Sequence, residues 1–342
     1  MIWHPLTWAF WAAALTGTLI YGFAAAYAMD VLQEWSPERS DSGQLRRERH
    51  AEIAALLARW SQAFLTIAAG LGLVGIAWIW HRAVPGAMCG TGVLQAMGPP
   101  GSRALVFWMI SLAILYAWQV MDRLNRQHPG GLLTPTATRT MVSAAPFLVL
   151  AVAFAWQALM RVDSVPAVSC CAAVYDRVIQ EMSPSTAGRW VAPIAMWTGL
   201  AGSGVVIVTA IWKARFPHRG PSAILAIATF VWAVASSIAV KQVWSAYYYQ
   251  VLSHPCPWCL FLPDYWGAGW FIYAAIAWAV VEGVAQWIAD RTRRNHPLLA
   301  EMAADRVRRS AWRMVWAVVG FSLLTTGPAV IWRLRTGVWL GG

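Results

Sequence analysis

The segment Cys256-Pro257-Trp258-Cys259 contains the residues of this sequence that are best suited to carry chemistry. Two intervening residues let both sulfur atoms approach bonding distance across one turn of chain. Proline is a favoured first residue of a helix, so a short helix beginning near Pro257 would stabilise a thiolate on Cys256. Thiol–disulfide exchange needs one exposed sulfur of low pKa and a resolving partner, and this motif supplies both. The spacing therefore predicts redox chemistry of the two thiols.

Metal binding and a structural disulfide are the two other interpretations of this motif. A tetrahedral zinc site would need two further ligands, and the sequence offers candidates in Cys89, Cys170, Cys171, His4, His81 and His254. Covalent attachment of a c-type haem is excluded, because it requires histidine directly after the second cysteine and Leu260 stands there. Redox exchange, metal binding and a structural disulfide all stay open on these residues alone.

The composition indicates what kind of protein must position these thiols. Of the 342 residues, 59% are hydrophobic and 12% are charged, and the mean hydropathy is +0.50. A soluble protein cannot bury so many apolar side chains, and a disordered chain is poor in them. The sequence therefore predicts an all-α polytopic membrane protein. Eight segments are long and apolar enough to cross a bilayer, namely residues 6–29, 60–80, 104–121, 142–160, 190–212, 223–243, 267–288 and 311–332.

The distribution of basic residues predicts the orientation of these spans. With the amino terminus outside, 18 of the 26 lysines and arginines fall on the inner side and eight on the outer side. Cytoplasmic loops carry such an excess, so we expect a bacterial inner-membrane protein whose amino terminus is periplasmic. The first span lacks basic residues before it and is too long for a signal peptide, so we expect it to stay uncleaved. The net charge of +11 then needs no nucleic-acid partner.

The same orientation places all five cysteines on the outer side. Cys89 lies between spans 2 and 3, Cys170 and Cys171 between spans 4 and 5, and Cys256 and Cys259 between spans 6 and 7. Thiols oxidise outside the cytoplasm, so this clustering indicates disulfide chemistry or metal capture. Because five is odd, at least one thiol stays unpaired when the others are oxidised.

Two of these outer segments resemble each other. Val84-Pro85 precedes Cys89 with the same spacing by which Val165-Pro166 precedes Cys170. Each segment follows an arginine at a span end and leads through a Met-x-Pro step to another arginine. Duplicated helix pairs are common in membrane proteins, so spans 2–3 and 4–5 are interpreted as candidate copies of one helical hairpin. The alternative is that proline and cysteine coincide in two short loops.

The stretch from span 4 to span 7 resembles the vitamin K epoxide reductase family and, more distantly, the bacterial DsbB disulfide-forming proteins. That family carries a Ser-Cys loop after the first helix of a four-helix bundle and a CxxC before the fourth, as Ser169-Cys170 and the Cys256 motif do here. The resemblance covers less than half of the chain. It implies that Cys259 lies next to a quinone (ubiquinone or menaquinone) and that Cys256 exchanges with Cys170. It also implies that the loop sulfurs accept electrons from an outside, thioredoxin-like thiol protein.

The sequence departs from that family in two ways. The family has a further loop cysteine several residues before the Ser-Cys pair, and the corresponding segment here contains none. Cys89 is the candidate to take its place, because a bond between the neighbours Cys170 and Cys171 would close a strained ring. Pro263 and Asp264 interrupt the run before span 7, so the CxxC is expected on a separate helical turn.

Two ionisable residues of the spans are further candidates. Glu282 lies within span 7, where such groups are functional by default, but pairing with inner arginines is the favoured interpretation. Lys241 lies at the outer end of span 6, where it either snorkels to the interface or acts beside the CxxC and a quinone.

The sequence thus predicts three regions and one principal function. The regions are residues 1–121 with spans 1–3, residues 122–290 with the four-helix redox bundle, and residues 291–342 with a basic inner loop and span 8. The predicted function is thiol–quinone oxidoreduction, without a metal, through Cys256, Cys259, Cys170, Cys171 and Cys89. The alternatives are a membrane protein that binds or transports a soft metal such as copper, zinc or mercury, and a structural anchor subunit of an electron-transfer complex.

Overall fold

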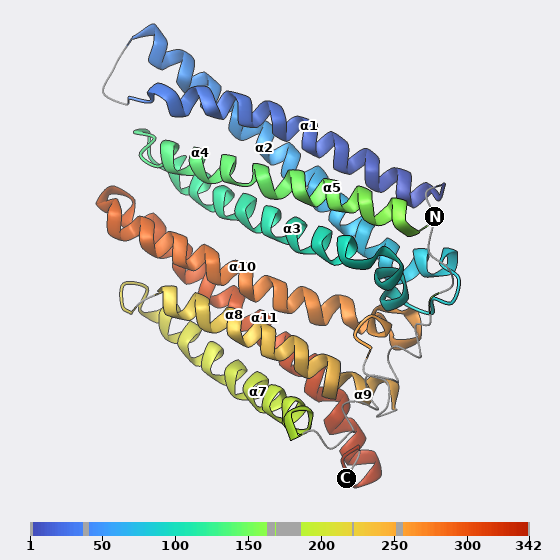
Figure 1. Ribbon diagram of the computed structural model, residues 1–342. Coiled ribbons are helices and arrows are strands. Elements are labelled where there is room, and N and C mark those ends of the chain that lie inside the picture. The colour runs from blue at the N-terminus through green and yellow to red at the C-terminus, as the bar shows by residue number, and fades with distance from the viewer. Residues whose placement is uncertain are drawn as a thin grey trace. The chain divides into compact units, whose positions relative to one another are not determined.

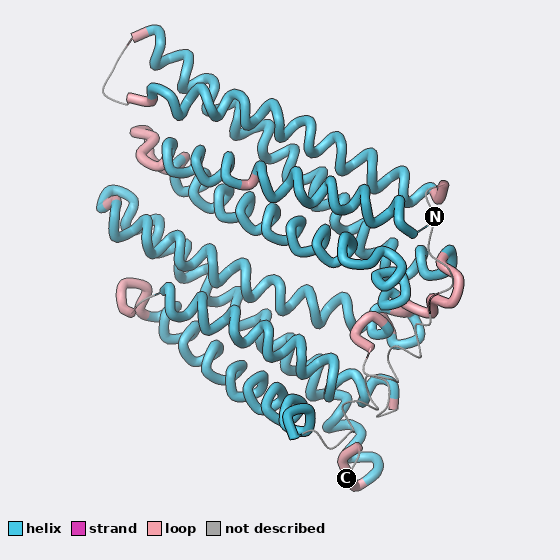
Figure 2. Tube along the Cα trace, in the orientation of Figure 1, coloured by secondary structure: helices cyan, strands magenta, loops and turns pink. Residues whose placement is uncertain are grey.

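The computed structural model describes residues 3–36, 41–162, 168, 186–220, 222–250 and 256–340. Eight of its helices are long and apolar enough to cross a membrane, which confirms the predicted all-α polytopic fold. The α-helices of the described residues are α1 (Pro5–Glu34), α2 (Ser42–Val74), α3 (Gly90–Asn125), α4 (Thr134–Ser143), α5 (Ala145–Val162), α7 (Thr186–Arg215), α8 (Ser222–Ala239), α9 (Ser245–Tyr249), α10 (Ala268–Asn295) and α11 (Ala300–Thr336) (Figure 1). In total 87% of the structure is helical, and the described residues contain no strand (Figure 2).

Short turns of other helix types continue or connect these helices. The π-helical turn η1 (Gly75–Ile79) and the 3-10 turn η2 (Trp80–Ala83) extend α2, and the π-helical turn η3 (Val240–Trp244) joins α8 to α9. Three further 3-10 turns precede α10 and α11, namely η4 (Cys259–Phe261), η5 (Pro263–Tyr265) and η6 (Pro297–Leu299). The helices α4 and α5 together form one span, and so do α8, η3 and α9.

Side-chain caps explain where the first two helices begin. The Nδ1 atom of His4 accepts a hydrogen bond from the N–H of Leu6, with Pro5 in the first helical position. The carboxylate of Asp41 accepts from the N–H of Gln44 at 2.7 Å. Both pairs satisfy a backbone donor that a helix start leaves without a partner. Because α2 begins at Ser42, the polar residues that precede the apolar part of span 2 belong to the same helix.

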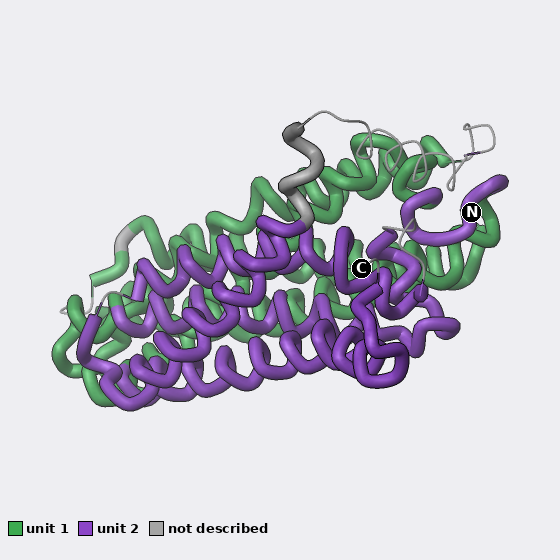
Figure 3. The backbone as a smooth tube through the Cα atoms, turned by 90° about the horizontal axis from the view of Figure 1, so that it is seen from below, with its two compact units in different colours: residues 1–84, 93–166, 291–303 green, residues 85–92, 167–290, 304–342 purple. Residues whose placement is uncertain are grey.

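The chain divides into two compact units (Figure 3). Unit 1 consists of Met1–Val84, Val93–Pro166 and Arg291–Ala303, and unit 2 consists of Pro85–Gly92, Ala167–Asp290 and Ala304–Gly342. This division differs from the regional boundaries expected from the sequence. Span 4 belongs to unit 1 because it packs on α1, where the hydroxyl of Tyr21 donates to the carbonyl oxygen of Met141 at 2.6 Å. The short segment that carries Cys89 belongs to unit 2.

Close approach of small residues holds α1 and α2 together in unit 1. A Cβ atom added to Gly17 would lie 3.0 Å from Cγ of Leu65, and the hydroxyl of Ser61 donates to the carbonyl oxygen of Gly17 at 2.8 Å. Small residues at a helix–helix contact are typical of membrane bundles, where packing and hydrogen bonds replace the hydrophobic effect. Side chains of α2 therefore pack directly on the backbone of α1 at Gly17.

In unit 2 the helices α7, α8 and α11 meet around Trp232, which is fully buried. Its indole N–H donates to the hydroxyl of Ser203 on α7 at 2.8 Å, and its ring meets Phe321 of α11 edge to face with 5.2 Å between the ring centroids. The carboxylate of Glu282 on α10 pairs with Arg306 and Arg313 of α11. This confirms the predicted pairing of Glu282 with inner arginines and fastens α10 to α11.

Gly17→Val should lower the thermal unfolding midpoint of the detergent-purified protein, because the larger side chain would force α1 away from Leu65. Overpacking of this kind costs about 1–3 kcal/mol. Gly22→Val is the matched control, since a Cβ atom at Gly22 of the same helix meets nothing within 4 Å in the described part of the chain. Equal midpoints of the two variants would contradict close packing at Gly17.

Candidate functional site

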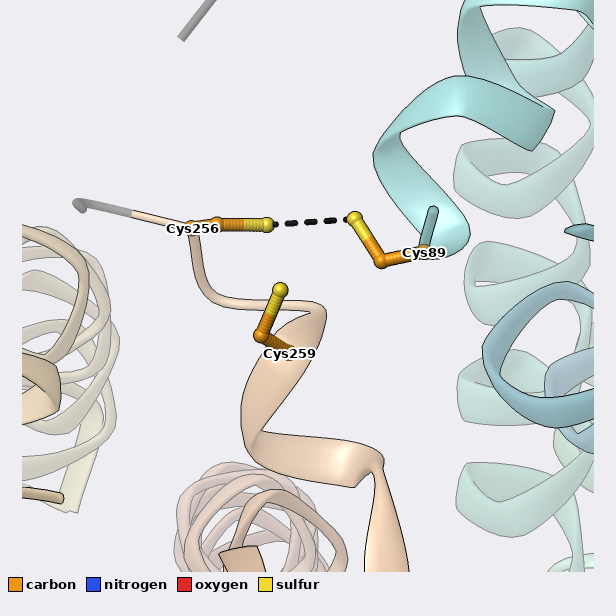
Figure 4. A group of neighbouring side chains, drawn as sticks. All are labelled: Cys89, Cys256 and Cys259. Atoms are coloured by element: carbon orange, nitrogen blue, oxygen red, sulfur yellow. Dashed lines mark hydrogen bonds between the residues drawn. The ribbon is translucent and has the colours of Figure 1, made fainter. Parts of the chain in front are cut away.

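Three of the five predicted site cysteines come together in unit 2. The sulfur atoms of Cys89, Cys256 and Cys259 all lie within 4.8 Å of one another. Figure 4 shows the three sulfur atoms turned toward each other, from segments that are far apart in the sequence. Cys170 and Cys171 lie outside the described residues. We call Cys89, Cys256 and Cys259 the thiol triad.

Within the thiol triad, Cys256 makes the closest contacts. Its Sγ atom lies 3.5 Å from Sγ of Cys89 and 3.1 Å from the hydroxyl oxygen of Thr91. The distance between the sulfurs is that of a contact and exceeds the roughly 2.05 Å of a disulfide bond, so this is the reduced state. The three residues are 2%, 1% and 7% exposed for Cys89, Cys256 and Cys259 respectively. The exposed sulfur expected in the CxxC is therefore not found, because both cysteines of the motif are buried together with Cys89.

The CxxC lies on short turns that are separate from the spanning helix α10. The N–H of Phe261 donates to the carbonyl oxygen of Trp258, and the N–H of Leu262 donates to that of Cys259, which together form η4. Pro263 then begins η5, and Trp266 and Gly267 both have positive φ angles before α10 starts. The separation expected from Pro263 and Asp264 is confirmed.

The short helix expected near Pro257 starts two residues later, as a 3-10 turn. Pro257 and Trp258 form a turn, and η4 begins at Cys259 with Trp258 as its N-cap. The backbone amide of Cys259, the first residue of η4, still favours the charged form of Cys256, and hydrogen bonds from side chains add to it.

Hydrogen bonds from Cys259, Cys89 and Thr91 lower the pKa of Cys256, although burial of the sulfur acts in the opposite direction. A thiol or hydroxyl that donates to a sulfur favours its charged form. Since the pKa falls on folding, the Cys256 thiolate stabilises the fold fully above the unfolded thiol value of about 8.5. This contribution is lost as the pH falls through the pKa of the folded state. These contacts thus favour the thiolate form of Cys256.

A kink in α3 and a tyrosine position the two sides of the thiol triad. Gly98 has a φ of 62° and interrupts α3 before Pro99, so that residues 90–97 form a short helical stretch, which carries Thr91. On the other side, the hydroxyl of Tyr249 donates to the carbonyl oxygen of Cys256, and its ring meets Tyr265 at 4.5 Å between centroids. The sequence did not single out Thr91 as a site residue, although it stands two positions after a predicted site cysteine.

The loop before Cys89 contacts the second of the two similar outer segments. The N–H of Val168 donates to the carbonyl oxygen of Pro85 at 2.9 Å. Gly86 has a φ of +79°, and a Cβ atom there would lie 2.0 Å from the carbonyl oxygen of Val168. Only glycine fits this close approach. Of the second segment, Val168 is the described residue, and it contacts the first segment at Pro85 and Gly86.

Aromatic rings cluster around Phe261, which stands two residues after Cys259. Phe261 lies 5.4 Å from Trp258, 4.9 Å from Trp270 and 5.5 Å from Tyr273, measured between ring centroids. Its ring is stacked with that of Tyr273 at an interplanar angle of 15°. These rings provide flat apolar faces two residues from the sulfur of Cys259.

The other predicted candidates lie away from the thiol triad or outside the described residues. Lys241 is half-buried in η3, and its ammonium group makes no hydrogen bond or ion pair within the described chain. His4 caps α1, His81 lies in η2, and His254 is outside the described residues. Among the described residues, no histidine or carboxylate joins the three sulfurs.

Thr91→Val should raise the pKa of Cys256, because valine keeps the shape of threonine and removes the hydroxyl donor. A hydrogen bond to a charged group corresponds to a shift of about 1–2 pH units. The pH dependence of Cys256 alkylation by a small reagent, read by peptide mass spectrometry, measures this shift.

Thr66→Val is the control, since the hydroxyl of Thr66 bonds to the carbonyl oxygen of Gln62 in its own helix. Identical alkylation profiles of the Thr91 variant and the wild type would show that Thr91 does not stabilise the thiolate.

Comparison of the chain with protein-family models, with curated proteins and with solved structures finds no match. Any proposal for the function therefore rests on the geometry of the thiol triad and on the chemistry of its residues. The central observation is that three buried cysteine sulfurs lie within 4.8 Å of one another.

Proposed function

We propose that this protein is a membrane thiol–disulfide oxidoreductase that passes electrons from periplasmic dithiols to a membrane quinone. The observation that carries the proposal is the position of Cys256, whose sulfur lies within contact distance of Cys89 and close to Cys259. A cysteine with two neighbouring sulfurs can form a disulfide with either of them. This is the minimum that a relay of disulfide bonds requires.

The internal step of the relay is an exchange at Cys256. In the oxidised protein Cys256 is bonded to Cys259. The Cys89 thiolate attacks the sulfur of Cys256, the Cys89–Cys256 bond forms, and the Cys256–Cys259 bond breaks with its electron pair on Cys259. No atom is lost in this step, and the disulfide moves from one side of Cys256 to the other.

Entry of electrons needs a further thiol, because Cys89 and Cys256 are too buried for another folded protein to reach. The chain has two other cysteines, Cys170 and Cys171, and the resemblance to vitamin K epoxide reductases gives them this role. The contact between Val168 and the Pro85 loop supports it, since Val168 stands two residues before Cys170 in the sequence. A thioredoxin-like protein that presents a dithiol is the expected partner.

Exit of electrons takes place at Cys259. The rings of Trp258, Phe261, Trp270 and Tyr273 near Cys259 suit the flat ring of ubiquinone or menaquinone. When bound, the quinone supplies an acceptor for two electrons and two protons. Partner dithiol and quinone thus become partner disulfide and hydroquinone, and the two thiol protons balance those that the quinone takes up.

The orientation of the chain agrees with this use of the thiols. The inner excess of 18 basic residues over eight supports a bacterial inner membrane with the amino terminus and the cysteine segments on the periplasmic side. Disulfides form and persist in that compartment. Membrane lipid surrounds the apolar helices.

Cys259→Ala should trap a disulfide on Cys256, with Cys89 or with Cys170, because the resolving thiol is missing. Dithiol-dependent reduction of ubiquinone should be lost in membranes that contain this variant. Differential alkylation and mass spectrometry identify the bond, and ultraviolet absorption follows the quinone.

Cys89→Ala separates the two halves of the relay. It should keep the oxidation of Cys256 and Cys259 by quinone and lose their reduction by the external dithiol. The proposal is wrong if all five thiols stay reduced in cells and in both variants. A structural anchor would instead lose abundance when Cys256 and Cys259 are both changed to serine, without any change in a redox rate.

Binding of a soft metal is the second candidate function, favoured by the three sulfurs within 4.8 Å. Three thiolates without a histidine suit Cu(I) better than Zn²⁺, which prefers four ligands. Anaerobic titration of the reduced protein with Cu(I) against a chromogenic chelator tests this candidate. It predicts one equivalent of tightly bound Cu(I), lost in Cys89→Ser, and no dithiol-dependent quinone reduction. Failure of the wild type to compete with the chelator would reject it.

A further inference from the structure

A second group of polar residues lies inside unit 2, away from the cysteines. Glu282, Gln286 and Asp290 are 0%, 1% and 2% exposed and occur at every fourth position of α10. This spacing places them on one face of the helix. Three such residues within a membrane-spanning helix are costly and need partners from the chain or a ligand.

Ion pairs hold the first and last of these residues. Glu282 Oε2 lies 3.1 Å from Arg306 Nη2, and Glu282 Oε1 lies 3.0 Å from Arg313 Nη1. Two turns further along α10, Asp290 Oδ1 lies 3.5 Å from Nζ of Lys213, which also donates to two backbone carbonyls after α7. Gln286 therefore lies between two layers of buried charge.

Gln286 itself has no partner for either end of its amide. Its Nε2 and Oε1 atoms are both buried without a hydrogen bond, and the same holds for the hydroxyl groups of Ser222 on α8 and Ser310 on α11. Ser222 is 1% exposed and Ser310 is 0% exposed. Each buried polar group without a partner costs about 1–3 kcal/mol. Three of them on three helices point to a common ligand.

The register of the helices brings these three groups to one level of unit 2. At Gly283, a Cβ atom would lie 3.7 Å from Cα of Ala226 on α8 and 3.8 Å from Cε of Met314 on α11. Gln286 comes three residues after Gly283, while Ser222 and Ser310 come four residues before Ala226 and Met314. The helices α8 and α11 run opposite to α10, so a step forward along α10 and a step back along α8 or α11 lead toward the same end of the bundle. All three residues therefore lie about 4.5–6 Å from the level of Gly283, in the same direction.

The charged groups around this level carry one positive charge in excess. The buried Lys213 and Arg306 balance the carboxylates of Glu282 and Asp290, and the partly exposed Arg313 adds a third cation at the edge of the layer. The amide N–H groups of Gln286 and the two hydroxyls are donors that suit an anion. An excess positive charge within a membrane bundle favours a negatively charged ligand over water alone.

We propose that Gln286, Ser222 and Ser310 bind a small monovalent anion of halide size, such as chloride. The amide nitrogen and the two hydroxyls donate to the anion, and a water molecule donates to Oε1 of Gln286. The anion neutralises the excess charge between the two ion-pair layers. This site is independent of the thiol triad and stabilises the bundle of α8, α10 and α11.

Replacement of gluconate by chloride at constant ionic strength tests the proposal on the detergent-purified full-length protein. The thermal unfolding midpoint should rise with chloride, on the order of several degrees at about 100-fold excess over the dissociation constant. Bromide should act in the same way. Gln286→Leu should lose the dependence on halide. Gln286→Glu should lose it as well and keep a high midpoint without halide, because its carboxylate takes the place of the anion.

Gln62→Leu is the matched control, since the amide oxygen of Gln62 is also buried without a partner but lies in unit 1. This variant and Cys256→Ser should both respond to chloride as the wild type does. Equal midpoints in chloride and gluconate would show that water alone occupies the site. A chloride effect that persists in both Gln286 variants would place the anion elsewhere and overturn the proposal.

Discussion

Hydrocarbon offers no hydrogen bonds, so a polar group within the spans of this protein needs a partner inside the chain or in a bound ligand. The hydroxyl of Tyr21 donates to a backbone carbonyl of span 4, and the indole of Trp232 donates to Ser203. Glu282 is held by two arginines of the following span. These pairs join helices that are distant in the sequence, and they decide which helices can pack together.

The same constraint shapes the end of unit 2 where the cysteines gather. Sulfur is a weak hydrogen-bonding group and tolerates burial better than a carboxylate does. The chain can therefore leave its helices at Cys89 and at the CxxC and still bury both segments. The backbone there is satisfied locally, by the turn after Trp258, by Tyr249 on the carbonyl of Cys256, and by Val168 on the carbonyl of Pro85.

Much of this arrangement could be predicted from the sequence, because its causes are local. Apolar length gives the eight spans, and Pro263 separates the CxxC from α10. The arginines near Glu282 in the basic inner loop indicate its partners. From the sequence, Cys89 could be named only as a candidate to replace the loop cysteine that the resembling family has. Its contact with Cys256 joins residues 167 positions apart and depends on tertiary packing.

The misplaced helix start at Pro257 shows the limit of propensity. Proline favours the first position of a helix. Here Pro257 and Trp258 form a turn between the two cysteines, and the helical turn begins only at Cys259. Thr91 was missed for a related reason. A threonine near a helix start is common, and its bond to Cys256 exists only because two distant segments meet.

The two disulfides that Cys256 can form differ in a property of the unfolded chain. A bond between Cys256 and Cys259 closes a ring of only a few residues, whereas a bond to Cys89 spans 167 positions. Closing the larger loop removes more chain entropy from the unfolded state, by about 3 kcal/mol on the simple loop-closure account. The proposed exchange at Cys256 would therefore change the free energy of unfolding of the protein, although the number of disulfides stays the same.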